Sequence, residues 1–203
     1  DFVGSLGGLI ALVQGQADVA GSHLWDEESD TYNTPFVKKL LPGRRVALLT
    51  LAHRRLGLIV PSGNPAGLTS LQDLTRPGLR FVNRQRGAGT RVWLDYHLRR
   101  QDIEPGAIDG YRKERATHSA VARAIVEGQA DVGLGVEAAA LAHKLEFIYL
   151  TLERYDLVIP ADVWDNPAIV ALATWLPTLD AQACIAGLGG YDTHATGRVE
   201  WIE

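Results

Sequence analysis

The sequence contains one cysteine and no methionine among its 203 residues. With Cys184 alone, the chain cannot form an internal disulfide or a multi-cysteine metal site. We expect this thiol to be a small core residue near the end of a helix. No apolar run approaches the length that spans a bilayer, and no signal peptide is visible. Because the chain starts at Asp1 and lacks methionine, we interpret it as part of a longer protein.

Positive charge is also scarce, since 20 Lys and Arg stand against 24 Asp and Glu, for a net charge of -4. This balance lacks the basic footprint of nucleic-acid binding, and we expect no direct nucleic-acid contact by this domain and no membrane contact. It does not exclude an anionic ligand, because backbone dipoles can outweigh a weak global charge locally. Hydrophobic residues at 46% and charged residues at 22% are ordinary for one large domain or two small lobes.

Short apolar runs alternate with amphipathic stretches, which predicts an α/β fold with largely parallel sheets. Helices are expected at 5–15, 89–101, 118–128 and 167–176. Strands are expected at 17–20, 46–51, 57–60, 79–82, 131–134, 146–150 and 156–159.

One five-residue segment occurs twice, at 15–19 and at 128–132, with the sequence Gly-Gln-Ala-Asp-Val. Each copy follows a predicted helix and precedes a short apolar run. Glycine suits the left-handed position just past a helix end. Two distant copies of one unit indicate two related lobes rather than a solenoid, although a chance identity is the alternative.

The strand segments 57–60 and 155–159 are candidates for connections between two lobes. One lobe would then comprise residues 1–56 and 160–203, and the other residues 61–154. Two such hinge strands permit closure around a ligand.

A glycine-rich turn leads from the predicted strand at 79–82 into the next helix. Backbone N–H groups at such a helix start, with the positive end of the helix dipole, form an anion site. Gly89 belongs to the turn, Thr90 can add a hydroxyl, and Arg84 or Arg86 can add charge and forked donors. The turn lacks the Walker lysine and the third glycine of a dinucleotide fingerprint. A capped helix with solvated arginines is the alternative.

Polar residues also stand at two other predicted helix starts and after a strand. Thr117 and His118 open the helix at 118–128, and Ser5 occupies the matching position before the first copy of the repeat. Ser22 and His23 follow the strand at 17–20, at the end where ligands bind in open α/β sheets. The alternatives are an N-cap threonine, a structural histidine and an ordinary loop.

Catalytic signatures are missing: there is no G-x-S-x-G elbow, no H-E-x-x-H and no activated cysteine. We therefore expect a binding protein with no catalytic residues, no cofactor and no bound metal.

The combined pattern resembles the periplasmic-binding-protein-like domains related to molybdate- and tungstate-binding proteins. The resemblance covers nearly the whole chain and rests on residues 2–9, 17–24, 32–36, 81–91, 117–118, 153–160 and 189–192. It implies a type II periplasmic-binding-protein-like fold, with two α/β lobes joined by two hinge strands. Related tungstate binders carry R-x-x-x-S-G-T, which Arg84 and Thr90 match in spacing, whereas Ala88 replaces the serine and removes one hydroxyl. The family also usually has a preceding strand, which we expect this chain to lack.

The resemblance implies a sensor domain that closes on a small oxyanion, molybdate or tungstate, within molybdenum or tungsten cofactor metabolism. Its partner would be a fused helix-turn-helix or molybdopterin-biosynthesis domain. We expect a cytoplasmic location, or a periplasmic or extracellular one if a signal peptide was removed. Three alternatives remain: the effector domain of a transcriptional regulator that recognises a small organic molecule, an enzyme domain of molybdenum-cofactor assembly, and a scaffold that only dimerises.

Overall fold

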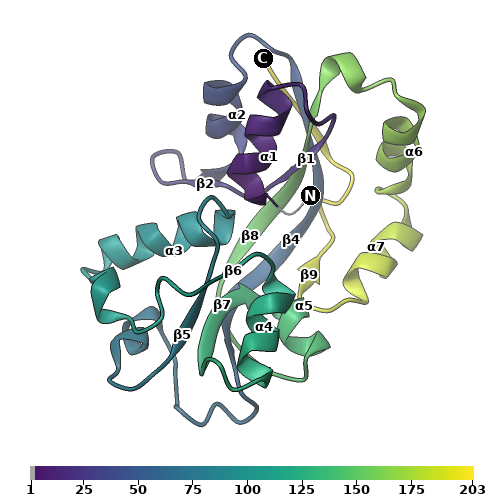
Figure 1. The fold of residues 1–203 in the computed structure, drawn as a ribbon. Coiled ribbons are helices and arrows are strands. Elements are labelled where there is room, and N and C mark those ends of the chain that lie inside the picture. Colours follow the sequence, from purple (N-terminus) through teal and green to yellow (C-terminus); the bar gives the residue numbers. More distant parts are fainter. Residues whose placement is uncertain (1–2) are drawn as a thin grey trace. The chain divides into compact units, whose positions relative to one another are not determined.

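The computed structural model describes residues 3–203. Asp1 and Phe2, the first two residues of the predicted segment 1–56, lie outside the described residues. The described residues form two compact units (Figure 1). The central unit is Arg55–Leu152, and the flanking unit combines Val3–Arg54 with Glu153–Glu203. Each unit contains helices packed on strands, as the α/β prediction requires.

Two 15-residue strands, β4 (Val46–Val60) and β8 (Glu146–Pro160), each contribute residues to both units. The units divide at 54/55 on β4 and at 152/153 on β8, whereas the sequence suggested crossings near 57–60 and 155–159. We expected two short strands in place of β4, at 46–51 and 57–60, and two in place of β8, at 146–150 and 156–159. This prediction was wrong, because β4 and β8 are each continuous. Arg54, in the gap between the two expected strands, forms a buried ion pair with Glu153 of β8, and β4 continues through it.

The central unit consists of one end of each long strand, three short strands, three helices and two 3-10 turns. Its further elements are η1 (Leu71–Thr75), β5 (Phe81–Arg84), α3 (Gly89–Arg100), η2 (Pro105–Ala107), β6 (Glu114–Arg115), α4 (His118–Val126), β7 (Val132–Val136) and α5 (Glu137–Ala142). The strand order is β8-β4-β7-β5-β6. This order brings the end of β5 and the starts of α3 and α4 into one unit, where the predicted arginine and threonine donors lie.

The flanking unit contains the remaining elements. They are α1 (Gly4–Val13), β1 (Ala20–Ser22), β2 (Trp25–Asp26), β3 (Thr31–Tyr32), α2 (Thr34–Leu40), η3 (Ala161–Val163), α6 (Pro167–Trp175), α7 (Leu179–Ala186), β9 (Tyr191–Asp192) and β10 (Val199–Ile202). Strand β1 pairs with β8, and β9 and β10 both pair with β4. Helix α1 packs against β1 (Figure 1), which places the start of α1 beside the residues that follow β1.

The prediction of largely parallel sheets was wrong. Only β5 with β6 and β5 with β7 pair in parallel among the strand pairs of residues 3–203 whose register is known. The pairs β1–β8, β4–β7, β4–β9, β4–β10 and β2–β3 are antiparallel. The alternation of helices and strands did not reveal this, because strand direction depends on how the long strands β4 and β8 are paired.

The internal repeat appears as the same helix end in both units. Gly15 follows α1 with a φ of 66° and Gly128 follows α4 with a φ of 68°, both in the left-handed region. In each copy the next N–H reaches back to the helix, from Gln16 to the Ala11 carbonyl and from Gln129 to the Ala124 carbonyl. This is the Schellman arrangement, which satisfies carbonyl groups that the last turn leaves without partners. The predicted reason for the repeated glycine is confirmed.

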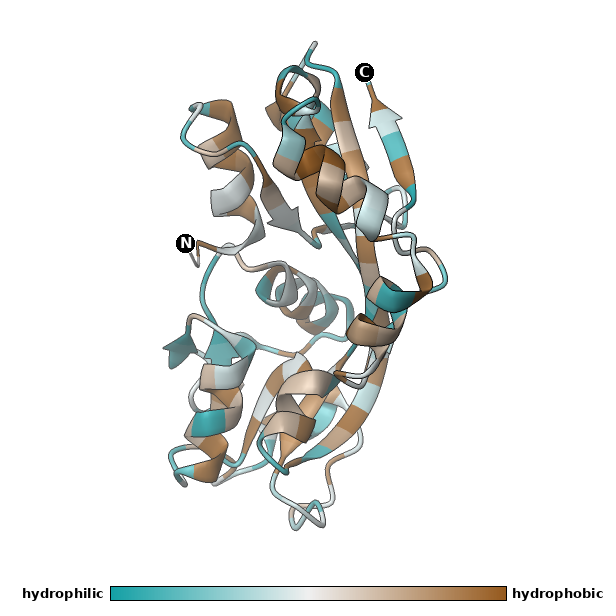
Figure 2. Cartoon of the chain, turned by 90° about the vertical axis from the view of Figure 1, so that its right-hand side faces the viewer, coloured by the Kyte–Doolittle hydropathy of each residue, from teal (hydrophilic) through white to brown (hydrophobic). Residues whose placement is uncertain are grey.

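The core of the central unit depends on close approach between α4 and β7. A Cβ atom on Gly133 would lie 2.4 Å from a methyl group of Val121, so a larger residue would push the helix off the strand. Buried apolar residues of β4, β5, α4 and α5 complete this core. Figure 2 shows hydrophobic stretches along the strands and helices, and hydrophilic residues both on helices and in loops. Burial of this apolar surface is the main force that stabilises such a unit.

Four predicted helices are confirmed within two residues at each end, whereas α2, α5 and α7 were not expected. These three helices are six to eight residues long, too short for a clear 3.6-residue pattern. The expectation that Cys184 is a core residue was wrong, since its side chain is exposed on α7.

Within residues 3–203, no single helix has both the length and the apolar content needed to cross a membrane. Helices α6 and α7 reach the required length and apolar content only when they are taken together, and the pair is bent by 79°. This match concerns length and composition alone.

Candidate functional site

The central unit gathers one set of predicted donors where β5 leads into α3. Arg84 ends β5 and is buried, and its Nη2 donates to the Ala116 carbonyl at 2.9 Å. Helix α3 starts at Gly89, and its cap residue Ala88 makes no side-chain bond to the first turn. Thr90 lies in this first turn with no exposed surface. Its hydroxyl oxygen has no hydrogen-bond partner, so a buried donor is present at the positive end of a 12-residue helix.

The start of α4 lies in the same unit, next to the Ala116 carbonyl that Arg84 contacts. Thr117 caps the helix, because its hydroxyl accepts the Ala120 N–H at 3.0 Å. This is the ordinary N-cap role that the sequence left as an alternative. His118 is the first residue of α4, and its Nδ1 would lie 3.3 Å from a Cβ atom on Gly135. The absence of a side chain at Gly135 therefore leaves room for the imidazole.

Two other arginines of this region have partners of their own. The side chain of Arg86 is 81% exposed and lies 3.8 Å from Glu114, so it is on the surface. Arg91 is buried and forms ion pairs with Asp95 at 2.7 Å and with Glu114 at 3.1 Å. Of the arginines in the turn, Arg84 thus combines burial with a position beside the α4 start. We call Arg84, Gly89, Thr90, Thr117 and His118 the central group.

The flanking unit gathers the other predicted donors. Ser5 lies in the first turn of α1, whose cap residue makes no side-chain bond. The Ser5 Oγ is 3.0 Å from Nδ1 of His23 and accepts the His23 backbone N–H at 3.3 Å. Ser22 is fully buried, and its hydroxyl has no hydrogen-bond partner. The structure therefore brings the predicted residues Ser5, Ser22 and His23 together beside the α1 start.

Tyr155 is an additional member of this set that the site prediction omitted. Its ring stacks on His23, with the ring centroids 5.5 Å apart and the planes at 27°. A Cβ atom on Gly21 would lie 2.1 Å from the Tyr155 hydroxyl, so glycine at this position makes room for the phenol. The Arg54 guanidinium lies 4.2 Å from the centre of the Tyr155 ring and pairs with Glu153. Ser5, Ser22, His23 and Tyr155 form what we call the flanking group.

The sequence contained one signal for Tyr155, which is its position within the resembling segment 153–160. Its stacking on His23 could not be predicted, because the register between β1 and β8 brings the two together. Gly21 is opposite Leu157 and Ser22 is opposite Asp156 in that register.

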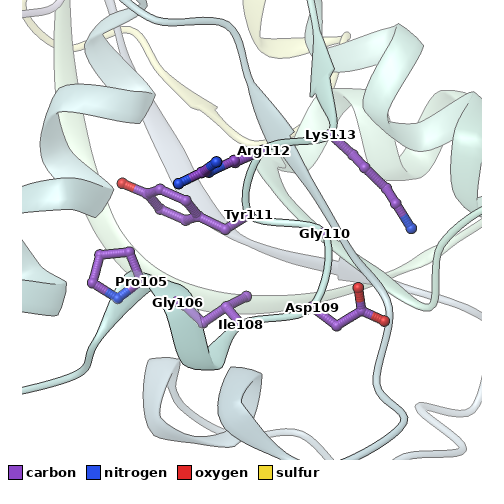
Figure 3. A pocket seen from close by; sticks show the side chains of 8 residues that line it. All are labelled: Pro105, Gly106, Ile108, Asp109, Gly110, Tyr111, Arg112 and Lys113. Carbon is purple, nitrogen blue, oxygen red and sulfur yellow. The ribbon is translucent and has the colours of Figure 1, made fainter.

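A surface hollow of about 480 Å³ lies elsewhere in the central unit, along residues 105–113 (Figure 3). Figure 3 shows Tyr111 and Arg112 on one side of this segment and Lys113 on the other. Tyr111 donates to the Asp95 carboxylate at 2.6 Å, so its hydroxyl is already used within the fold. None of the predicted site residues lines this hollow.

No set of three or more His, Cys, Asp or Glu side chains within residues 3–203 is arranged to hold a metal ion. The donors of both groups are hydroxyl, imidazole, guanidinium and backbone N–H groups. Such donors bind anions, and in particular oxygen atoms that carry negative charge.

Solved structures of substrate-binding proteins have a fold similar to that of this chain. The sulfate-binding protein SubI from Mycobacterium tuberculosis is 18% identical, with a TM-score of 0.64 over 93% of this chain and 73% of its own. A protein from Clostridium perfringens, assigned as a phosphate ABC transporter substrate-binding protein and solved with bound phosphate, is 12% identical. Its TM-score is 0.61 over 93% of this chain and 84% of its own. At these identities the likeness concerns the fold alone. It confirms the predicted periplasmic-binding-protein-like fold.

Residues 1–176 match the family described as "PBP superfamily domain", and the chain belongs to this family. The uncharacterized protein YvgK of Bacillus subtilis (strain 168) is 36% identical over 198 residues, which are 98% of this chain and 64% of that protein. The chain thus spans somewhat less than two thirds of the length of this relative. An uncharacterized protein encoded in the 5′ region of a 2Fe-2S ferredoxin gene of Clostridium pasteurianum is 38% identical over 109 residues, 53% of this chain and 96% of that protein.

Proposed function

We propose that this chain is a sensor domain that binds a small oxyanion, with molybdate and tungstate as the candidate ligands. The bound state would be passed to a partner that regulates molybdenum or tungsten cofactor metabolism. A fused helix-turn-helix or molybdopterin-biosynthesis domain is the proposed partner.

The observation that supports this proposal most is the Thr90 hydroxyl. A buried hydroxyl without a partner costs about 1–3 kcal/mol of desolvation. Thr90 is fully buried and has no partner, at the start of a helix with no side-chain cap. An oxyanion bound there would accept its hydrogen bond and compensate that cost, and the buried Arg84 would supply positive charge.

The affinity of such a site requires more than helix dipoles. A micromolar ligand needs about 8 kcal/mol, whereas one helix terminus contributes roughly 0.3–1 kcal/mol when exposed. Hydrogen bonds to charged groups contribute about 1.5–3 kcal/mol each. The central group and the flanking group each offer several such donors within its own unit.

Thermal unfolding with molybdate, tungstate, sulfate and phosphate tests the proposal. A ligand at a hundredfold excess over its Kd stabilises the folded state by about 2.7 kcal/mol. For a domain of this size we expect a rise in Tm of roughly 5–10 °C with molybdate or tungstate. If no oxyanion raises the Tm, the proposed function is wrong. If organic acids or amino acids raise it instead, the chain is the effector-binding domain of the alternative.

Thr90→Val then tests the observation itself. Valine has nearly the shape of threonine but cannot donate, so we expect unchanged or slightly higher stability without ligand. The Kd for molybdate should rise roughly 10- to 100-fold, as expected for the loss of one hydrogen bond to a charged group. Thr90→Ser keeps the hydroxyl and should bind nearly as the wild type does. Thr75→Val, which removes an exposed hydroxyl bonded to the Gln72 carbonyl, is the matched control and should leave Kd unchanged. Equal Kd values for Thr90→Val and wild type would exclude Thr90 as a ligand contact.

A further inference from the structure

Asn33 lies between β3 and α2 in a conformation that few residues other than glycine adopt. Its φ is 62° and its ψ is -45°, and its side chain is fully buried. Strained backbone of this kind costs of order 1–3 kcal/mol and persists only where the surroundings enforce it. Asn33 is the cap residue of α2, yet its side chain makes no bond to the first turn of that helix. The usual reason for asparagine at a helix start is therefore missing.

The Asn33 carboxamide instead holds the loop that contains Ser22 and His23. Its Oδ1 accepts the Leu24 N–H at 2.8 Å, and its Nδ2 donates to the Ser22 carbonyl at 3.2 Å. The Asn33 backbone N–H adds a bond to the Leu24 carbonyl at 2.8 Å. These three hydrogen bonds hold the backbone of Ser22 and Leu24, the residues on either side of His23.

The same Nδ2 also donates to Oδ2 of Asp156 at 2.7 Å. Asp156 is fully buried on β8 and lies opposite Ser22 in the strand register. Its Oδ2 also accepts from Nε of Arg154 at 2.7 Å, and its Oδ1 has no hydrogen-bond partner among residues 3–203. A buried carboxylate needs such donors. Asn33 thus fixes the loop to the strand and helps to compensate a negative charge close to the proposed oxyanion donors.

We infer that Asn33 is a positioning residue of the flanking group, one that sets Ser22 and His23 in the geometry for ligand binding without contacting the ligand. The inference rests on the proposed oxyanion binding. Only an amide supplies both an acceptor for the Leu24 N–H and donors for a carbonyl and a carboxylate from one planar group.

Asn33→Gly removes the carboxamide and tolerates the positive φ, so the backbone itself is not strained further. The chain offers a matched control in Asn64 of the central unit. Asn64 also has a positive φ, of 44°. Its carboxamide also holds a loop, because it donates to the Leu68 carbonyl at 2.8 Å and accepts the Leu68 N–H at 3.0 Å. Asn64→Gly therefore removes an equivalent pair of loop-stabilising hydrogen bonds that lies outside both donor groups.

The experiment measures the Kd for molybdate, the Tm and the hydrogen exchange of the Leu24 and Leu68 amides. We expect Asn33→Gly to raise the Kd at least tenfold and to speed exchange at Leu24, with Leu68 unchanged. Asn64→Gly should speed exchange at Leu68 with Leu24 and the Kd unchanged, whatever its effect on the Tm. An unchanged Kd in Asn33→Gly, or an unchanged Leu24 exchange rate, would overturn the inference.

Asn33→Asp tests the contact with Asp156 directly. It keeps the acceptor for Leu24 and the tolerance of positive φ, but it places a second carboxylate against Asp156, with Arg154 and the nearby His53 as the neighbouring basic groups. Two adjacent carboxylates repel until they share a proton. The loss of stability relative to wild type should therefore shrink between pH 7 and pH 5, whereas Asn64→Asp should show a constant difference. A pH-independent loss in Asn33→Asp would also count against the assigned contact.

The two proposals fail separately. If wild-type protein binds none of the four oxyanions, the proposed function is wrong. The exchange rates and the pH dependence still decide whether Asn33 holds the loop.

Discussion

The central group and the flanking group both include residues at helix starts, but their side chains are fixed differently. In the flanking group, His23 is bonded to Ser5 and stacked on Tyr155, and the Asn33 carboxamide binds the backbone of its neighbours Ser22 and Leu24. In the central group, Arg84 donates to a backbone carbonyl and the Thr90 hydroxyl has no partner. Helix starts can thus carry a rigid side-chain network in one unit and donors held mainly by backbone in the other.

The largest expected effect on stability comes from breaking the ion pair between Glu153 and Arg54, whose guanidinium lies over the Tyr155 ring. Both side chains are buried, at 10% and 2% exposure, so removing one takes away the opposite charge beside the other. We expect Arg54→Met or Glu153→Gln to lower the free energy of unfolding by about 3–5 kcal/mol. Denaturant unfolding measures this loss.

The exposed pair of Arg44 and Asp162 is the control for that prediction. Its side chains are 39% and 69% exposed, so Asp162→Asn should cost at most about 1 kcal/mol. The double variant Arg54→Met with Glu153→Leu should recover much of the loss, because neither charge is left alone. Equal costs for the buried and the exposed single variants would show that the flanking group does not depend on this pair.

A smaller effect is expected from Gly21→Ala, which tests how tightly Tyr155 is placed. The new Cβ atom would meet the Tyr155 hydroxyl at 2.1 Å, so the phenol must move away from its position beside His23. Overpacking of this kind costs about 1–3 kcal/mol, and the Kd for molybdate should rise.

Gly106→Ala is the matched substitution, since a Cβ atom there meets nothing within 4 Å. It should change the free energy of unfolding by less than about 0.5 kcal/mol. Unaltered oxyanion affinity in Gly21→Ala would remove Tyr155 from the flanking group.

The smallest expected effect is a pH dependence that originates in the flanking unit. Burial, together with His194 and to a lesser extent Arg154, holds the pKa of His53 below its ordinary value, against the opposite influence of Asp192 and Asp156. The unfolded chain therefore binds a proton at His53 more readily than the folded chain does. Stability falls as the pH drops through the ordinary histidine value of about 6.5, and the loss is complete below the folded pKa.

His53→Phe removes this titration and keeps a ring of similar size. We expect a weaker decline of Tm between pH 7 and pH 5 than in the wild type. His143→Phe, in the central unit and bonded to the Ser119 hydroxyl, is the comparison variant. If both variants keep the wild-type pH profile, His53 does not contribute to it.

The residues that contribute to the two groups were largely predictable from the sequence, because helix starts and strand ends have local signatures. From the sequence alone, Ser5, Ser22, His23, Thr90 and His118 were all expected as ligand residues. Their functions as ligand contacts remain predictions. Tyr155 was not placed in the site, because its role depends on the register between β1 and β8.

Some local expectations failed for reasons that involve tertiary structure. The strands expected at 46–51 and 57–60 are one strand, and Arg54 between them is paired with Glu153 on the neighbouring strand. Arg86 was grouped with Arg84, yet the two differ in exposure because only Arg84 ends a buried strand. Periodicity and spacing contain no information about such partners.

The amino-acid sequence by itself determined the α/β class, the four main helices and the glycine that ends each repeated helix, because these depend on local periodicity and backbone preference. The tertiary structure decided strand direction, the surroundings of Tyr155 and the position of the Asn33 carboxamide. Each of these requires residues far apart in the chain to meet, such as Asn33 and Asp156, and their meeting is fixed by strand register and packing.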